Sequence, residues 1–107
     1  MATLTEIQQK ISECPAVGLY ITAPNCGVCI ALKPKLKALM EQKFPQVIWE
    51  EANAEAQPAI PAYFQTFVVP TFIIFLDGKE FLRRARSVGL DELSSYLQRP
   101  YYLLFDE

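Results

Sequence analysis

The amino-acid sequence predicts an α/β domain in which helices cover both faces of a central mixed sheet. Helical and strand patterns alternate along the first part of the chain, as in parallel strands joined by helices. A hairpin pattern around Asp77-Gly78 then adds antiparallel strands. The chain has 107 residues, 51% of them hydrophobic, which suits one domain (1–107) with its own core. We expect a three-layer sandwich with four helices and four strands, or five if a short strand forms near the N-terminus.

The first half of the chain predicts two helices and two strands. Apolar residues at helical spacing favour a helix that Pro15 ends. The second helix contains Pro34, which should kink it because proline lacks an N–H and clashes with the preceding turn. The short apolar run after Pro15 indicates a buried strand, broken by Pro24. Helices are expected over 3–14 and 26–43, and strands over 17–23 and 47–52.

The second half predicts a short helical segment, a hairpin and a last helix. The segment 54–64 is helical in pattern but interrupted by prolines. Strands over 71–76 and 80–82 flank Asp77-Gly78, a pair suited to a type I′ turn. Leucines from Leu90 onward mark the last helix, which Pro100 should end. The apolar tail 101–105 should pack on its own domain, which favours a monomer; packing on a second copy is the alternative.

Composition excludes several classes of function. Histidine is absent, which rules out a Ser-His-Asp triad, a Cys-His pair and a histidine-ligated metal. The net charge is −2 and the longest basic run is Arg83-Arg84, so neither nucleic acid nor an anionic membrane is an expected partner. The N-terminal segment lacks the apolar core of a secretory signal, and the longest apolar stretch is too short to span a membrane. We therefore expect a cytoplasmic protein, where paired cysteines usually carry out chemistry or hold metal.

The chemical signal of the chain is the segment Cys26-Gly27-Val28-Cys29, which follows a buried strand and begins a helix. The spacing brings both sulfurs to one face of the first turn, within reach of a disulfide. Unpaired N–H groups at the helix N-terminus should lower the pKa of Cys26 from about 8.5 to roughly 3.5–7.5. Cys26 would then attack a partner's disulfide, and Cys29 would resolve the mixed disulfide. Gly27 should let a partner chain approach closely.

With its surroundings, this segment resembles the active site of the thioredoxin family, over about residues 3–97. Pro34 lies where that family's helix-kinking proline lies, and Val69-Pro70-Thr71 is similar to its cis-proline loop. The resemblance implies a thioredoxin-like three-layer sandwich and protein-disulfide oxidoreductase activity without a bound cofactor or metal. It also implies recharging by an NADPH-dependent flavin reductase. The substrate-binding residues implied are Asn25, Gly27, Val28, Val69, Pro70 and Gly89.

The chain departs from the family's pattern around the two cysteines. Asn25 replaces an aromatic residue, and Val28 replaces a proline. Tyr20 stands where family members carry a buried aspartate that helps to deprotonate the second cysteine, and Glu51 stands in place of a neighbouring lysine. We hypothesise that Glu51 accepts the proton of Cys29, through the Tyr20 hydroxyl or a water. In an apolar setting its pKa should be raised, which suits proton transfer near neutral pH.

These departures leave two alternatives to an oxidoreductase. The first is a redox-weak thioredoxin-fold module that binds partners through the same cleft but has lost efficient turnover. The second is a dimer that holds a metal through the Cys26 and Cys29 thiolates of two chains, because one chain offers three cysteines and no histidine. The remaining cysteine, Cys14, is expected to be a small buried or half-buried thiol.

Overall fold

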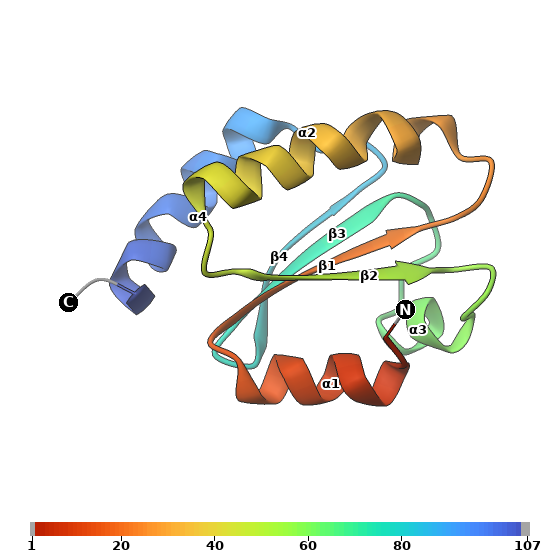
Figure 1. Cartoon of the computed structure of the whole chain (residues 1–107), viewed down its shortest axis with the longest axis horizontal. Coiled ribbons are helices and arrows are strands. Elements are labelled where there is room, and N and C mark those ends of the chain that lie inside the picture. The colour runs from red at the N-terminus through yellow and green to blue at the C-terminus, as the bar shows by residue number, and fades with distance from the viewer. Residues whose placement is uncertain (1, 106–107) are drawn as a thin grey trace.

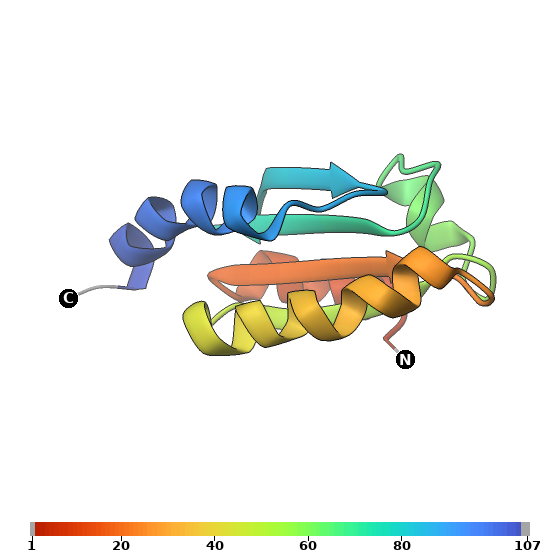
Figure 2. The same ribbon diagram turned by 90° about the horizontal axis from the view of Figure 1, so that it is seen from above.

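A four-stranded sheet with the order β2-β1-β3-β4 lies between two layers of helices in the computed structural model, which describes residues 2–105 (Figures 1 and 2). Strand β1 is parallel to β2 and antiparallel to β3, and β3 is antiparallel to β4. The strands are β1 (Ala16–Thr22), β2 (Ile48–Asn53), β3 (Thr71–Leu76) and β4 (Lys79–Ala85). The helices are α1 (Leu4–Glu13), α2 (Gly27–Lys43), α3 (Ala59–Tyr63) and α4 (Leu90–Phe105). The predicted fold class is confirmed, with four strands and no fifth among residues 2–105.

The two faces of the sheet are covered by different helices, as Figure 1 shows. Helices α2 and α4 cover one face and α1 and α3 the other, so each apolar face of the sheet is buried. The α2/α4 core contains among others Leu36, Met40, Phe44, Leu93 and Leu97. The α1/α3 core contains among others Ile7, Ile11, Ile60, Phe64 and Phe75.

Helix α1 begins and ends at the signals present in the sequence. The Thr3 hydroxyl accepts a hydrogen bond from the Glu6 N–H, and the Glu6 carboxylate accepts one from the Thr3 N–H. This capping box satisfies two amide groups that the first helical turn leaves unpaired. At the other end, the backbone becomes extended at Cys14, before Pro15. Cys14 is a half-buried free thiol, as expected.

An aromatic layer lies between the sheet and α2. The ring of Tyr20 stacks on Trp49 at a centroid distance of 5.5 Å, and Phe72 lies 5.5 Å from Trp49. Gly18 makes room for this layer, because a Cβ there would lie 2.8 Å from the Phe72 ring. Within this layer, Tyr20 lies beneath the start of α2.

The β3–β4 hairpin confirms the predicted turn. Asp77 and Gly78 both have positive φ, 52° and 79°, and Leu76 pairs directly with Lys79. These are the features of a two-residue type I′ turn. Strand β4 is longer than the predicted 80–82 because it pairs along the whole of β3.

Two predicted helix boundaries are wrong. Helix α3 covers only part of the expected segment 54–64, because the Asn53 carboxamide oxygen accepts hydrogen bonds from the Glu55 and Ala56 N–H groups and holds a turn there. Helix α4 continues through Pro100 instead of ending at it. The reason is tertiary: Tyr101 packs edge-on against Phe44 at 5.1 Å, and its hydroxyl accepts a hydrogen bond from the Gln46 N–H. Tyr101, Leu104 and Phe105 therefore pack on their own domain, as expected, whereas Tyr102 and Leu103 are exposed.

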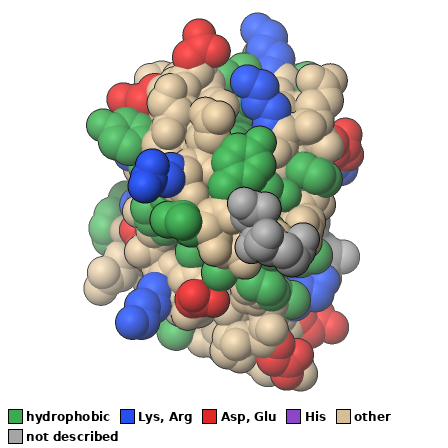
Figure 3. Space-filling model, turned by 90° about the vertical axis from the view of Figure 1, so that its left-hand side faces the viewer, with side chains coloured by type: hydrophobic (Ala, Val, Ile, Leu, Met, Phe, Trp, Pro, Cys, Tyr) green, Lys and Arg blue, Asp and Glu red, His purple; other side chains and the backbone are tan. Residues whose placement is uncertain are grey.

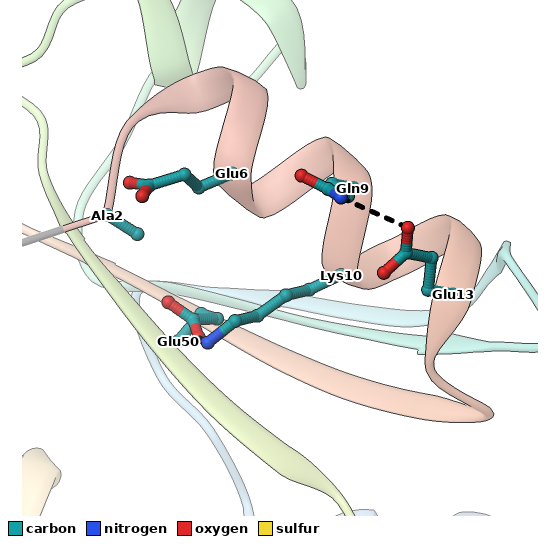
Figure 4. A pocket seen from close by; sticks show the side chains of 6 residues that line it. All are labelled: Ala2, Glu6, Gln9, Lys10, Glu13 and Glu50. Carbon is teal, nitrogen blue, oxygen red and sulfur yellow. Dashed lines mark hydrogen bonds and ion pairs between the residues drawn. The ribbon is translucent and has the colours of Figure 1, made fainter.

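Glu50, on the α1 face of β2, is a buried carboxylate that the sequence did not single out. Its side chain pairs with Lys10, which reaches across from α1 (Figure 4). The pair borders an open hollow of about 620 Å³ lined also by Glu6, Gln9 and Glu13. Pairing accounts for the burial of Glu50, since an unpartnered buried charge is costly.

Among residues 2–105, no helix combines the length and the apolar character needed to cross a membrane. Figure 3 shows the end of the molecule that carries the α4 C-terminus. There, acidic and basic side chains lie apart among hydrophobic ones, and neither sign gathers into one patch.

Candidate active site

The two cysteines lie where β1 leads into α2, at the end of the sheet that the α3–β3 loop also reaches (Figures 1 and 2). Cys26 is the N-cap residue of α2, and Cys29 lies in its first turn. The two form a disulfide, with their Cα atoms 5.2 Å apart. The predicted proximity of the sulfurs is therefore present.

The two sulfurs differ in exposure and in hydrogen bonding. Cys26 is partly exposed, whereas Cys29 is only 2% exposed. The Cys26 sulfur accepts a hydrogen bond from the Cys29 N–H at 3.2 Å. When the disulfide is reduced, this amide and the N-terminal end of α2 favour negative charge on Cys26. An accessible, stabilised thiolate beside a buried thiol suits a nucleophile and a resolving cysteine.

The turn before Cys26 depends on Asn25, whose φ is +58°. Asparagine tolerates this left-handed conformation better than most residues, and an aromatic residue less well. Gly27 and Val28 are both exposed beside the disulfide, and a Cβ on Gly27 would meet no atom within 4 Å. The surface around Cys26 is thus open to an approaching chain.

The α3–β3 loop, which contains the cis Val69–Pro70 peptide bond, is held by buried hydroxyl groups. The Thr71 hydroxyl donates to the Val68 carbonyl at 2.7 Å and lies 2.7 Å from the Thr66 hydroxyl. The Pro70 carbonyl accepts a hydrogen bond from the Arg86 N–H. By contrast, neither the N–H nor the C=O of Val69 pairs with another backbone group of residues 2–105.

An open hollow of about 350 Å³ borders this loop and the end of β1. Its lining is mostly apolar and includes Ala23, Pro61, Val68 and Val69. Phe67, which also lines it, is 91% exposed and therefore lies outside the core. Phe67 begins an apolar run that continues towards β3, so the sequence pattern alone does not distinguish it from a core residue.

Behind Cys29, the aromatic layer supplies a hydrogen bond that the sequence did not predict. The Tyr20 hydroxyl donates to the Cys29 carbonyl oxygen at 2.8 Å, and Tyr20 is fully buried. Burial, assisted by the nearby Glu51 charge, raises the pKa of Tyr20 to about 12. The phenol therefore stays protonated at neutral pH and acts as a donor.

Glu51 does not have the environment expected for it. Burial raises its pKa, but hydrogen bonds from Lys33 and Trp49, with the charges of Lys33 and Lys37, outweigh burial and lower the pKa overall. The Lys33 ammonium lies 2.8 Å from one carboxylate oxygen, and the Trp49 indole donates to the other at 3.1 Å. The expectation of a raised pKa in an apolar setting is therefore wrong. The sequence signal for this environment was the pair of α2 lysines, Lys33 and Lys37, which lie four residues apart.

The remaining predicted site residue, Gly89, precedes α4, where its carbonyl accepts a hydrogen bond from the Leu93 N–H.

Tyr20 and Glu51 are paired positions of the neighbouring parallel strands β1 and β2, so the strand register brings them together. Within residues 2–105, no three side chains of the metal-ligating types Cys, Asp and Glu are grouped to hold a metal ion.

Comparison with known proteins agrees with this geometry. The family model for thioredoxin matches residues 2–99. A thioredoxin-like protein of Bacillus subtilis, YdfQ, is 36% identical over 101 residues, covering 94% of this chain and 89% of its own. A thioredoxin of Chlamydia trachomatis is 32% identical over 94 residues, covering 85% of this chain and 88% of its own.

Solved structures show the same fold. Mitochondrial thioredoxin 3 of Saccharomyces cerevisiae in its oxidised form superposes with a TM-score of 0.80 at 21% identity, covering 92% of this chain and 91% of its own. Fasciola hepatica thioredoxin superposes with a TM-score of 0.79 at 24% identity, covering 92% of this chain and 94% of its own. With its paired cysteines at the start of α2, the chain belongs to the thioredoxin family.

Proposed function

We propose that this protein is a thiol–disulfide oxidoreductase that exchanges electrons between the Cys26–Cys29 dithiol and disulfides of other proteins. The observation that carries the proposal is the asymmetry of the pair: a partly exposed Cys26 sulfur facing an amide at a helix N-terminus, with a buried Cys29 bonded to it. Family membership supports the same chemistry.

The reaction consists of two exchanges. In the first, the Cys26 thiolate attacks one sulfur of the substrate disulfide; a mixed disulfide forms, and the other substrate sulfur leaves as a thiolate that takes up a proton. In the second, Cys29 loses its proton and attacks the Cys26 sulfur. The Cys26–Cys29 bond forms and the second substrate sulfur leaves, so two electrons have passed to the substrate. Run backwards, the same steps oxidise a dithiol.

The substrate is proposed to bind as an extended segment along the α3–β3 loop. Support comes from Val69, whose backbone groups have no backbone partner among residues 2–105, and which lies beside exposed apolar side chains. An added strand pairs through such groups, while neighbouring side chains provide selectivity. Asn25, Gly27, Val28, Pro70 and Gly89 complete the proposed binding surface.

Three further proposals concern the cellular setting. A flavin reductase that uses NADPH is proposed to recharge the dithiol, as the family resemblance suggests. A monomer is proposed, supported by the packing of Tyr101 on Phe44 of its own domain. A cytoplasmic location is proposed because the paired cysteines suit chemistry in a reducing compartment.

The direct test is reduction of insulin disulfides with dithiothreitol as the electron source. The wild type should accelerate the reaction, Cys26→Ser should not, and Cys29→Ser should accumulate a mixed disulfide visible by mass spectrometry. Cys14→Ser is the matched control, because Cys14 is a free thiol at the end of α1, and it should retain activity. A wild type no faster than Cys26→Ser would reject the proposal in favour of a binding module that lacks turnover.

A further inference from the structure

The first turn of α2, which carries both cysteines, is weakly stabilised by its own sequence. Gly27 and Val28 are poor helix formers, one for its backbone freedom and the other for its β-branch. Pro34 has no N–H to donate to the Ile30 carbonyl, so the helix also lacks a hydrogen bond just beyond this turn. Contacts with other elements must therefore help to hold Cys29 in place.

One such contact comes from β1. The Tyr20 hydroxyl bonds the Cys29 carbonyl at 2.8 Å inside the protein, linking the centre of the sheet to the first turn of α2. The Tyr20 ring is itself fixed by stacking on Trp49 and by packing near Phe72. The donor is thus held by packed aromatic rings, and the acceptor belongs to the buried cysteine of the pair.

We propose that Tyr20 is a positioning residue for the exchange reaction: its hydrogen bond to the Cys29 carbonyl keeps the resolving thiol within reach of Cys26 once the disulfide has opened. This inference rests on the proposed function and assigns a role to the residue that stands where family members carry an aspartate. The phenol is not a proton acceptor here; it acts through backbone geometry. The Cys29 proton leaves by another route.

The chain offers a matched control in Tyr101. Both tyrosines are buried and both hydroxyls make one hydrogen bond to a backbone group, but Tyr101 accepts its bond from Gln46, which lies between α2 and β2. Tyr20→Phe and Tyr101→Phe therefore remove comparable interactions, one at the cysteine pair and one away from it. Unfolding in urea should show similar, modest losses of stability for both variants.

The experiment measures the equilibrium between the reduced protein with oxidised glutathione and the disulfide protein with two molecules of reduced glutathione. Tyr20→Phe should lower the equilibrium constant for disulfide formation about two- to tenfold, the range expected for losing one hydrogen bond. It should slow the attack of Cys29 on a Cys26–glutathione disulfide by a similar factor. Tyr101→Phe should match the wild type in both measurements. The ratio of the equilibrium constant of Tyr20→Phe to that of the wild type should stay the same from pH 6 to 9.

The outcome distinguishes positioning from a general structural role. An unchanged constant in Tyr20→Phe, or an equal decrease in Tyr101→Phe, would overturn the proposal, and so would a ratio that varies with pH. Adding Gly27→Ala, which strengthens the turn without meeting any atom within 4 Å, should restore part of the constant; no restoration would also contradict it. Because glutathione is the only reagent, failure of insulin reduction would reject the proposed function without deciding this question.

Discussion

The front and the rear of the cysteine pair differ in how they are built. At the front, the features that face a partner belong to the backbone: the Cys29 amide at the Cys26 sulfur, the left-handed turn at Asn25 and the Val69 groups, which have no backbone partner in the described part of the chain. At the rear, behind Cys29, the contacts come from side chains: the Tyr20 hydroxyl on the Cys29 carbonyl and the Lys33–Glu51 ion pair. The front of the site therefore depends on backbone conformation, and the rear depends on the identity of its side chains.

The aromatic layer at the rear should show the largest effect on stability. Gly18→Ala places a Cβ 2.8 Å from the Phe72 ring, so the layer must shift, and overpacking of this kind costs about 1–3 kcal/mol. Urea unfolding measures the loss. Gly27→Ala, where a Cβ meets open space, is the stability control and should cost nothing. Equal stability of Gly18→Ala and wild type would show that the layer is loosely packed.

The left-handed turn at the front should be the next most sensitive feature. Asn25→Val puts a β-branched residue at φ +58° and should destabilise the protein by roughly 1–2 kcal/mol, whereas Asn25→Gly should be tolerated. Thermal unfolding of the two variants compares them directly. If valine and glycine gave the same melting temperature, the turn would not require this conformation.

The exposed apolar surface beside Val69 should affect substrate use without affecting stability. Phe67→Ser is expected to lower kcat/KM for insulin by about three- to tenfold, because partner contacts of such side chains contribute about 1 kcal/mol. Reduction of a small aromatic disulfide should be unchanged. Leu103→Ser, at a residue 74% exposed in the last turn of α4, should alter neither rate. An insulin rate equal to wild type would remove Phe67 from the binding surface.

The charged groups at the rear should produce a pH-dependent effect of modest size. The lowered pKa of Glu51 contributes stability above its unfolded value of 4.5, and that contribution is lost as the pH falls through the folded pKa. Glu51→Gln should therefore narrow the difference in stability between pH 7 and acid. The same variant tests the hypothesis that Glu51 accepts the Cys29 proton: an unchanged rate of mixed-disulfide resolution from pH 6 to 9 would reject it.

Tyr20 should produce a pH dependence of the opposite sign, in which stability is lost as the pH rises through the alkaline range. Because its pKa rises from 10.0 to about 12 on folding, the folded state holds the proton more tightly. Its contribution is present below pH 10 and is lost as the pH rises to about 12. Tyr20→Phe should therefore lose less stability than wild type over this interval, as followed by circular dichroism. Parallel curves for the two proteins would contradict the buried phenol.

The sequence predicted the layered fold, the type I′ turn and the position of the cysteine pair, because each depends on periodicity or on local backbone preferences. It did not predict the hydrogen bond from Tyr20 to Cys29 or the Lys33–Glu51 ion pair, because both join residues on different elements. The raised pKa expected for Glu51 was wrong for the same reason. Helix α4 passed through Pro100 because packing of Tyr101 outweighs a local stop signal.

The proposed function requires the start of α2 to hold Cys26 as an accessible thiolate. Alkylation of the reduced protein by iodoacetamide, followed at Cys26 by mass spectrometry across pH 5–10, tests it most directly. The rate should be at least half of its plateau value by about pH 7.5, because the pKa of a thiol activated in this way lies at or below that value. A rate that rises through about pH 8.5, as for an ordinary cysteine, would contradict it.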